Sequence, residues 1–198
     1  LRVLMKLFLQ KGIIQIFEIL VILGVLGYYF EYRFSKDMSN KFTWHFSFEE
    51  NEYDYAFLGS SRALNMIDIN LIDTALSKNG INLGMGGADY RTLYMILYSF
   101  VEIQNNKVQN LIVQVDPFIL YNPIYSNPRM DYNFYSRSNY SEIKKCIQDE
   151  KMIWIYRYMP IIKFIEYNNV LNFTHFINSF SESSVLSESK GSSLVFED

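Results

Sequence analysis

Apolar and polar positions follow distinct patterns along the chain, and these patterns divide it into an anchor, a connecting segment and a domain. Residues 12–30 form an almost unbroken apolar run. As a helix rising about 1.5 Å per residue, the run roughly matches the ~30 Å hydrocarbon thickness of a bilayer. No polar face recurs along it, as one would in a helix packed on a soluble core. The pattern predicts a transmembrane anchor at residues 12–30, preceded by residues 1–11.

The residues that flank the apolar run bear on its orientation. Basic residues precede the run at Arg2, Lys6 and Lys11, and a similar number follow it. Because a long following domain is translocated largely regardless of its charge, we expect a single-pass protein of the cell membrane with a cytoplasmic N-terminus and an extracytoplasmic domain. Tyr28 and Tyr29 stand where a signal peptidase would need small residues, which favours an uncleaved anchor.

Short apolar runs alternate with helical spacing in the domain, which we place at residues 53–198 after a polar and aromatic tether at residues 31–52. Such alternation indicates βαβ units and a parallel sheet. The sequence therefore predicts an α/β fold, a flavodoxin-like three-layer arrangement with about three strands present. The expected elements, in chain order, are strand 55–58, helix 68–77, strand 81–83, helix 92–103 and strand 111–115.

The second half of the domain carries weaker patterns. Residues 121–140 are rich in Tyr, Asn and Pro, which is compatible with a sugar-binding surface and equally with an ordinary amphipathic shell. A helix is expected at residues 141–158, with Ser141 as its N-cap, and a Ser-rich loop at residues 179–193. Residues 194–196 have the composition of a further strand.

Composition narrows the functional classes. Hydrophobic residues make up 49% of the chain, which is ample for a packed core, while a net charge of −3 without a basic stripe argues against a nucleic-acid partner. One cysteine, Cys146, excludes an internal disulfide, and we interpret it as a small buried residue. Two distant histidines give no metal-ligand spacing, so no metal is expected.

Glycine and polar residues follow each expected strand. The first strand enters Gly59-Ser60-Ser61-Arg62, the second enters residues 84–89, and the third ends at Asp116. Because ligands of parallel sheets bind at the carboxyl ends of the strands, these residues are expected to form a site. Ser60-Ser61 would also suit a simple helix-capping turn. Residues 84–87 lack a Walker lysine and the dinucleotide spacing, so no cofactor is expected.

Two of these motifs resemble sequence blocks of the SGNH (GDSL-type) hydrolase superfamily, and Asp116 falls where a third block lies. Gly59-Ser60-Ser61 resembles the first block, and Asn82-Leu83-Gly84-Met85-Gly86-Gly87 resembles the second. The subgroup that the chain resembles is membrane-anchored and includes the D-alanyl transfer protein of teichoic acids and alginate-type O-acetyltransferases. The resemblance extends over residues 54–120.

The resemblance implies roles for individual residues. Ser61 would be the nucleophile, and the N–H groups of Ser61 and Gly87 would form an oxyanion hole. Arg62, Asn82 and Gly84 would lie in the substrate-binding region. Asp116 stands where the family has an Asn donor, so it would supply a third donor only if protonated, or else orient an arginine or cap the strand.

The sequence departs from the family in its catalytic base. A serine needs a histidine that is oriented by a carboxylate, and the family supplies both in an Asp-x-x-His block near the C-terminus. His175 has Asn172 where that aspartate belongs, and His45 lies in the expected tether. Either the domain is truncated at its C-terminus or it is a non-catalytic relative. We favour truncation, in which case the chain alone would be inactive.

Two functions are therefore considered. The first is a membrane-anchored esterase or O-acyltransferase that acts through Ser61 on a cell-envelope polysaccharide or teichoic-type polymer, with a multispanning membrane protein delivering the acyl donor. The alternative is a non-catalytic module of the same fold that binds a glycan or a membrane acyltransferase partner.

Overall fold

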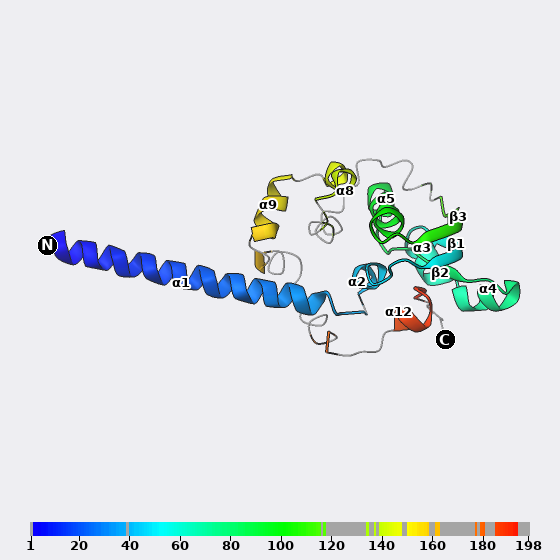
Figure 1. Ribbon diagram of the computed structural model, residues 1–198, viewed down its shortest axis with the longest axis horizontal. Coiled ribbons are helices and arrows are strands. Elements are labelled where there is room, and N and C mark those ends of the chain that lie inside the picture. Colours follow the sequence, from blue (N-terminus) through cyan, green and yellow to red (C-terminus); the bar gives the residue numbers. More distant parts are fainter. Residues whose placement is uncertain are drawn as a thin grey trace.

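A long N-terminal helix leads into a domain built around a small parallel sheet (Figure 1). The computed structural model describes residues 2–38, 40–115, 117, 134, 137, 139–147, 150–158, 161–162, 177, 179–180 and 185–193. Asp116, His175, most of the Tyr/Asn-rich segment at residues 121–140 and the apolar residues 194–196 lie outside the described residues.

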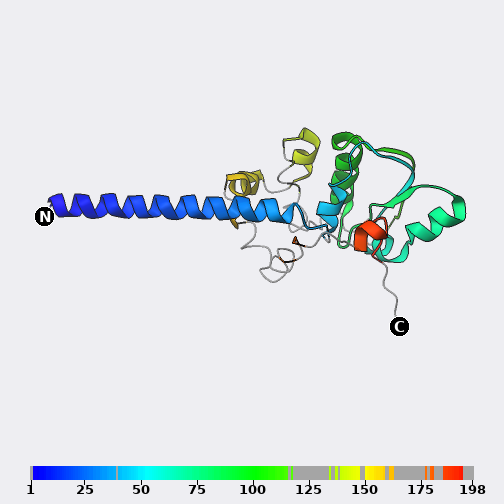
Figure 2. The ribbon, with the colours of Figure 1, turned by 60° about the horizontal axis from the view of Figure 1, so that its bottom comes forward.

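Helix α1 (Arg2–Phe34) contains the expected anchor and extends beyond both of its ends. Its segment Phe8–Phe34 is long and apolar enough to cross a membrane. Most side chains of this segment are exposed, and the helix projects away from the domain in both ribbon views (Figures 1 and 2). Among the described residues, this helix therefore meets the length and composition expected of a membrane span.

The segment expected to be a tether contributes to the core of the domain. It contains helix α2 (Lys41–His45), whose first turn is capped by Asn40 through a 2.9 Å bond that the amide of Phe42 donates to Oδ1. Trp44 of this helix is completely buried, and its ring contacts the Phe48 ring at a centroid distance of 4.7 Å.

The described strands form a parallel sheet of three in the order β2-β1-β3. Strand β1 (Glu52–Leu58) is central, with β2 (Gly80–Asn82) on one side and β3 (Lys107–Val113) on the other. This confirms the predicted α/β class and its parallel sheet. Strand β3 begins and ends earlier than the predicted strand at 111–115, because pairing with β1 already starts at Lys107 opposite Glu52.

Helices connect the strands, with differences from the predicted boundaries. Helix α3 (Ser61–Met66) was not predicted, because it is too short for an apolar periodicity to show. Helix α4 (Ile69–Leu76) lies within the predicted range 68–77, with Asp68 as its N-cap and Ser77, in the left-handed conformation, as its C-cap. Ile69 of this helix is buried whereas Leu76 is exposed.

The second connection begins earlier than predicted and changes geometry near its end. Helix α5 (Tyr90–Tyr98) starts two residues before the predicted Thr92, because Asp89 caps it by accepting a 2.8 Å bond from the amide of Thr92. It continues as a π-helical turn, η1 (Ser99–Ile103), that leads to β3.

The helix predicted at residues 141–158 is interrupted. Helix α8 (Ser141–Cys146) ends at Ile147, whose backbone is extended, and α9 (Glu150–Tyr158) follows it. A short helix, α12 (Val185–Glu188), lies beside α2 in the Ser-rich region expected to be a loop.

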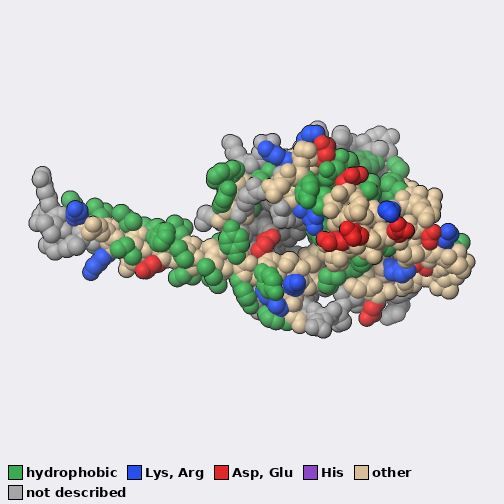
Figure 3. Space-filling model, in the orientation of Figure 1, with side chains coloured by type: hydrophobic (Ala, Val, Ile, Leu, Met, Phe, Trp, Pro, Cys, Tyr) green, Lys and Arg blue, Asp and Glu red, His purple; other side chains and the backbone are tan. Residues whose placement is uncertain are grey.

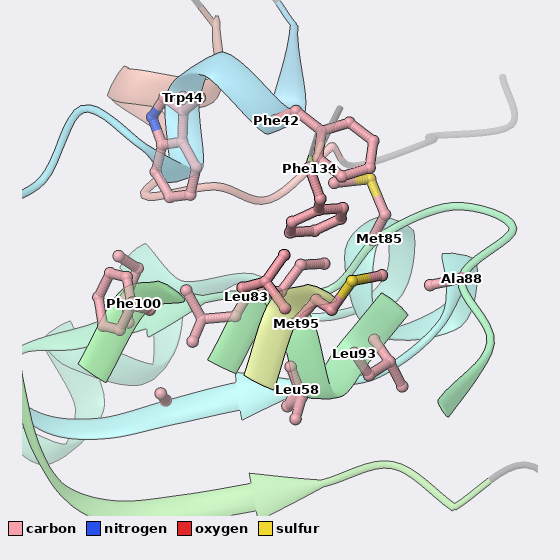
Figure 4. Close-up of a cluster of buried hydrophobic side chains, with 14 of the residues drawn as sticks. Phe42, Trp44, Leu58, Leu83, Met85, Ala88, Leu93, Met95, Phe100 and Phe134 are labelled. Atoms are coloured by element: carbon pink, nitrogen blue, oxygen red, sulfur yellow. The ribbon is translucent and has the colours of Figure 1, made fainter. Parts of the chain in front are cut away.

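The two faces of the sheet pack against different helices. Ala56 and Leu58 of β1 belong to the main apolar core, whereas Tyr55 points to the other face and its hydroxyl donates a 2.5 Å bond to Asp73 of α4. Figure 4 shows the core between the strands and the helices above them. The core residues drawn there include Phe42, Trp44, Leu58, Leu83, Met85, Leu93, Met95, Phe100 and Phe134.

The two outer strands of the sheet differ in how they are covered. At β2, the backbone of Asn82 receives a 2.7 Å bond from the buried Nζ of Lys41 and donates one of 3.0 Å to Lys190 O. By contrast β3 is exposed along most of its length, and Leu111, Ile112 and Val113 each keep more than 40% of their surface. The apolar composition of β3 is therefore not matched by burial within the described part of the chain.

Replacing Trp44 tests whether the segment that follows the anchor is part of the folded core. Trp44→Ala should lower the free energy of unfolding by about 3–5 kcal/mol, because it removes a fully buried ring. Leu71→Ala is the control, since Leu71 is exposed on α4 and its loss should cost no more than about 0.5 kcal/mol. Denaturant unfolding in detergent, followed by far-UV circular dichroism, measures both, and equal losses would contradict the assignment.

Candidate active site at the carboxyl ends of the strands

The turns that follow the strands lie beside one another because backbone pairing continues beyond the strand ends. The amides of the second and third turns donate to carbonyls at the end of β1 and just after it. These bonds are Leu83 N to Phe57 O (2.7 Å), Met85 N to Gly59 O (2.9 Å) and Gln114 N to Leu58 O (2.8 Å). The structure thus brings together the segments that contain Ser61, residues 84–87 and Gln114.

Ser61 is the first residue of α3 and is exposed at the carboxyl end of the central strand. Ser60, which precedes it in the N-cap position, is buried and makes no side-chain capping bond. The hydroxyl of Ser61 is therefore accessible, while its neighbour is not. Arg62 is also exposed on this helix.

Glycines allow the turn after β2 to approach α3 closely. A Cβ on Gly84 would lie 2.7 Å from the backbone nitrogen of Leu64 and 2.8 Å from Oδ1 of Asn82, so any side chain there would separate the turn from the helix. Gly87 has a φ of +72°, a conformation that glycine adopts without strain, and it is exposed. Gly87 and Ser61 therefore lie on neighbouring turns and both face solvent.

Asn82 joins the two turns from beneath the surface. It is completely buried, its Nδ2 donates a 2.7 Å bond to the carbonyl of Ala63, and its Oδ1 accepts a 2.8 Å bond from the amide of Gly84. The expectation for Asn82 was contact with substrate. The structure shows both side-chain polar atoms bonded to backbone, which gives Asn82 a positioning role.

Gln114 is a site residue that the sequence analysis missed. Its Oε1 accepts a 2.9 Å bond from the amide of Ala63 in α3, so it holds the turn after β1 from the side of β3. The sequence predicted Asp116 instead, which is two positions later and lies outside the described residues. The signal that could have identified Gln114 is a polar residue inside an otherwise apolar strand-like run, LIVQV.

His45 does not qualify as a base for Ser61. It is buried in α2, and neither ring nitrogen has a hydrogen-bond partner among the described residues. Burial, reinforced by the positive charge of Lys41, lowers the pKa of the His45 imidazole well below its ordinary value. Burial likewise lowers the pKa of the Lys41 ammonium. Of the two histidines in the chain, only His45 is among the described residues, whereas His175 lies outside them. The described residues therefore include no histidine that could act as a base for Ser61.

A cavity of about 230 Å³ lies at the opposite end of the sheet from Ser61. It opens at the amino ends of β1 and β2 and is lined by aromatic rings and polar side chains, among them Trp44, Phe48, Tyr53, Asn79 and Lys190. Within the described part of the chain, the buried indole nitrogen of Trp44 has no hydrogen-bond partner. Burial raises the pKa of the Tyr53 hydroxyl to about 12, so this ring stays neutral.

Neither metal-binding side chains nor Cys146 provide a further site among the described residues. Within the described ranges, no group of three or more His, Cys, Asp and Glu side chains is placed to hold a metal ion. Cys146, the single cysteine of the chain, is partly buried against the core. Family models, curated proteins and solved structures give no match to this chain.

Removing the Asn82 side chain tests its positioning role. Asn82→Leu leaves the carbonyl of Ala63 and the amide of Gly84 without this partner, and each lost partner should cost about 1–3 kcal/mol of unfolding free energy. The matched control is Asn110→Leu, because Asn110 is exposed and bonds to one backbone oxygen, Asp54 O. Chemical denaturation compares the two, and a smaller loss at Asn82 than at Asn110 would contradict the role.

The buried His45 predicts a pH dependence of stability. Unfolded His45 takes up a proton as the pH falls through its ordinary pKa of 6.5, whereas the folded side chain remains neutral until a lower pH. The unfolded state therefore binds more protons below pH 6.5, and the free energy of unfolding should decrease as the pH falls from 6.5.

The variant His45→Leu isolates this effect, because it removes the titrating ring and breaks no side-chain hydrogen bond to the described residues. Unfolding free energies of both proteins are measured in steps from pH 8 downward. Below about pH 6.5, the free energy of unfolding of the wild type should fall relative to that of His45→Leu. Parallel curves would show that His45 is not a source of the dependence.

Proposed function

We propose that the chain is a membrane-anchored serine esterase or O-acyltransferase of the SGNH type, acting on a cell-envelope polysaccharide or a teichoic-type polymer. The observation that carries this proposal is the exposure of Ser61 at the carboxyl end of the central strand, beside the glycine-rich turn after β2 and Gln114 after β3. Ligands of parallel sheets bind at this edge.

The strand order supports a flavodoxin-like arrangement. The parallel order β2-β1-β3 is the beginning of the doubly wound order 2-1-3-4-5, in which the site lies where neighbouring connections leave in opposite directions. In this proposal β3 is an inner strand, and its exposed apolar residues Leu111, Ile112 and Val113 are covered in the complete sheet.

The proposed reaction is acyl transfer through a covalent serine ester. The Ser61 hydroxyl loses its proton to a base and its oxygen attacks the carbonyl carbon of an ester or thioester. The N–H groups of Ser61 and Gly87 stabilise the tetrahedral oxyanion, which collapses as the alcohol or thiol leaves with a proton from the base. Water or a polymer hydroxyl then gives its proton to the base and attacks the carbonyl carbon of the acyl-serine. The Ser61 oxygen leaves with that proton, and the acyl group is released as a free acid or as a polymer ester.

Two parts of this scheme fall to residues other than those expected from the sequence. Gln114 Nε2 is a neutral amide donor near the first turn of α3, and so suits the third oxyanion contact better than a carboxylate such as Asp116. The base must be a histidine outside the described residues, either His175 or one contributed by further chain. Arg62 is the neighbouring exposed cation for an anionic polymer.

The proposed setting is the cell membrane, with α1 as a single span, a cytoplasmic N-terminus and an extracytoplasmic domain. A 27-residue apolar segment that is exposed over most of its length supports this setting. A multispanning membrane protein that delivers the acyl donor is the proposed partner.

The cavity at the other end of the sheet supports a second candidate function, that of a non-catalytic binding module. Its aromatic lining, with Asn79, Lys190 and the unpartnered indole nitrogen of Trp44, suits a small polar group such as a sugar unit. In this case Ser61 has no base, and the domain holds a glycan or a membrane acyltransferase.

Covalent labelling separates the two candidates. The intact membrane-embedded protein, including whatever segment supplies the base, should react with a serine-directed fluorophosphonate probe, and Ser61→Ala should abolish the labelling because it removes the attacking oxygen. Ser60→Ala is the matched control, since the Ser60 side chain is buried and makes no capping bond. Labelled protein is read by in-gel fluorescence. An unlabelled wild type, or equal labelling of Ser61→Ala, would overturn the enzyme in favour of the binding module.

A further inference from the structure

Exposed aromatic and aliphatic side chains gather where α1 meets the domain. Figure 1 shows α9 on one side of the end of α1 and the short segment near residue 180 on the other. In the space-filling view, patches of hydrophobic side chains lie at this end of the domain (Figure 3). We call these residues the collar, and it comprises Tyr28, Tyr29 and Tyr32 of α1, Trp154, Ile155 and Tyr158 of α9, and Ile177 and Phe180.

The collar begins at the depth where α1 should leave the hydrocarbon. The apolar segment Phe8–Phe34 has 27 residues, which corresponds to about 40 Å of helix, roughly 10 Å more than a hydrocarbon core. The domain already touches α1 at Gly27, which is buried and would place a Cβ 2.8 Å from the backbone nitrogen of Ile161. The surplus length of α1 is therefore the part enclosed by the collar.

The contacts of Arg33 fix the other side of the collar to the anchor. Its guanidinium donates a 2.6 Å bond to the carbonyl of Ser179 and lies 3.7 Å from the centroid of the Phe180 ring. These two contacts hold the 179–180 turn against the end of α1. The orientation of the collar relative to the span is thus set by packing on both sides.

Helix α9 has one face in the core and one face outside it. Ile153 and Tyr156 are buried, whereas Trp154, Ile155 and Tyr158 are exposed, and the rings of Trp154 and Tyr158 lie 4.5 Å apart. Tryptophan and tyrosine are enriched at the headgroup level of membranes, where a ring can rest on apolar chains while its polar atom meets water.

We propose that the collar lies in the headgroup layer of the bilayer that α1 spans, so that α9, Ile177 and the 179–180 turn hold the domain against the membrane surface. This inference rests on the membrane anchoring in the proposed function. The outward face of α9 then has a lipid partner, which accounts for three large exposed side chains within five positions.

Tryptophan fluorescence tests the contact directly, because the chain has two tryptophans in opposite environments. Trp44 is completely buried in the core, while Trp154 is 70% exposed. The full chain is reconstituted in phosphatidylcholine vesicles with and without brominated acyl chains, and the difference between wild type and Trp154→Phe isolates Trp154. We expect Trp154 to lose most of its emission to brominated lipid and to be shielded from aqueous acrylamide.

A second variant supplies a tryptophan of equal exposure away from the collar. Leu71 is 69% exposed on α4, which Figure 1 places at the far end of the domain from α1. In Trp154→Phe/Leu71→Trp the new ring should be quenched by acrylamide and not by brominated lipid.

Flotation of the protein with the vesicles separates the two proposals. Flotation with lipid quenching of Trp154 supports the collar. Flotation with Trp154 quenched by acrylamide alone, as at position 71, overturns the collar and leaves the anchor intact. Failure to float overturns the anchor and the collar with it.

Discussion

Parallel pairing of β1 on both of its edges is the constraint on which the rest of the domain depends. Strands β2 and β3 both run parallel to β1, so the carboxyl ends of all three strands lie at the same edge of the sheet. The pairing also persists beyond the strands, through the amides of Leu83, Met85 and Gln114. The turns around Ser61 are therefore held together by backbone hydrogen bonds. Asn82 and Gly84 set how closely α3 approaches the turn after β2.

The α/β class and the location of the strand-end turns could be predicted from the sequence because both depend on local patterns. A strand followed by glycine and serine, as at residues 55–61, and helical apolar spacing at residues 92–103 are signals that neighbouring residues create by themselves. Parallel topology follows from the alternation of such elements. For the same reason the apolar length of α1 could be recognised without any knowledge of its surroundings.

The features that could not be predicted depend on contacts between distant parts of the chain. Trp44 is a core residue because the sheet lies beside it, and nothing around position 44 distinguishes it from a tether. Asn82 had the same appearance as a substrate-binding residue, and its two bonds to backbone are visible only once α3 is in place. The exposure of β3 is likewise invisible in LIVQV, whose composition is that of a covered strand.

The outer edge of β2 has a consequence for the order in which the molecule can assemble. The ammonium group of Lys41 bonds to both Asn82 and Gly191, the latter 150 positions away, and Lys190 accepts from the amide of Asn82. During synthesis, β2, which ends at Asn82, is complete more than a hundred residues before its last partner, Lys190, emerges. Until then Lys41 lacks one of its two acceptors and β2 presents a bare strand edge. Such late pairing across a long loop slows folding, and an unpaired strand edge in the nascent domain is a place where other strands can pair.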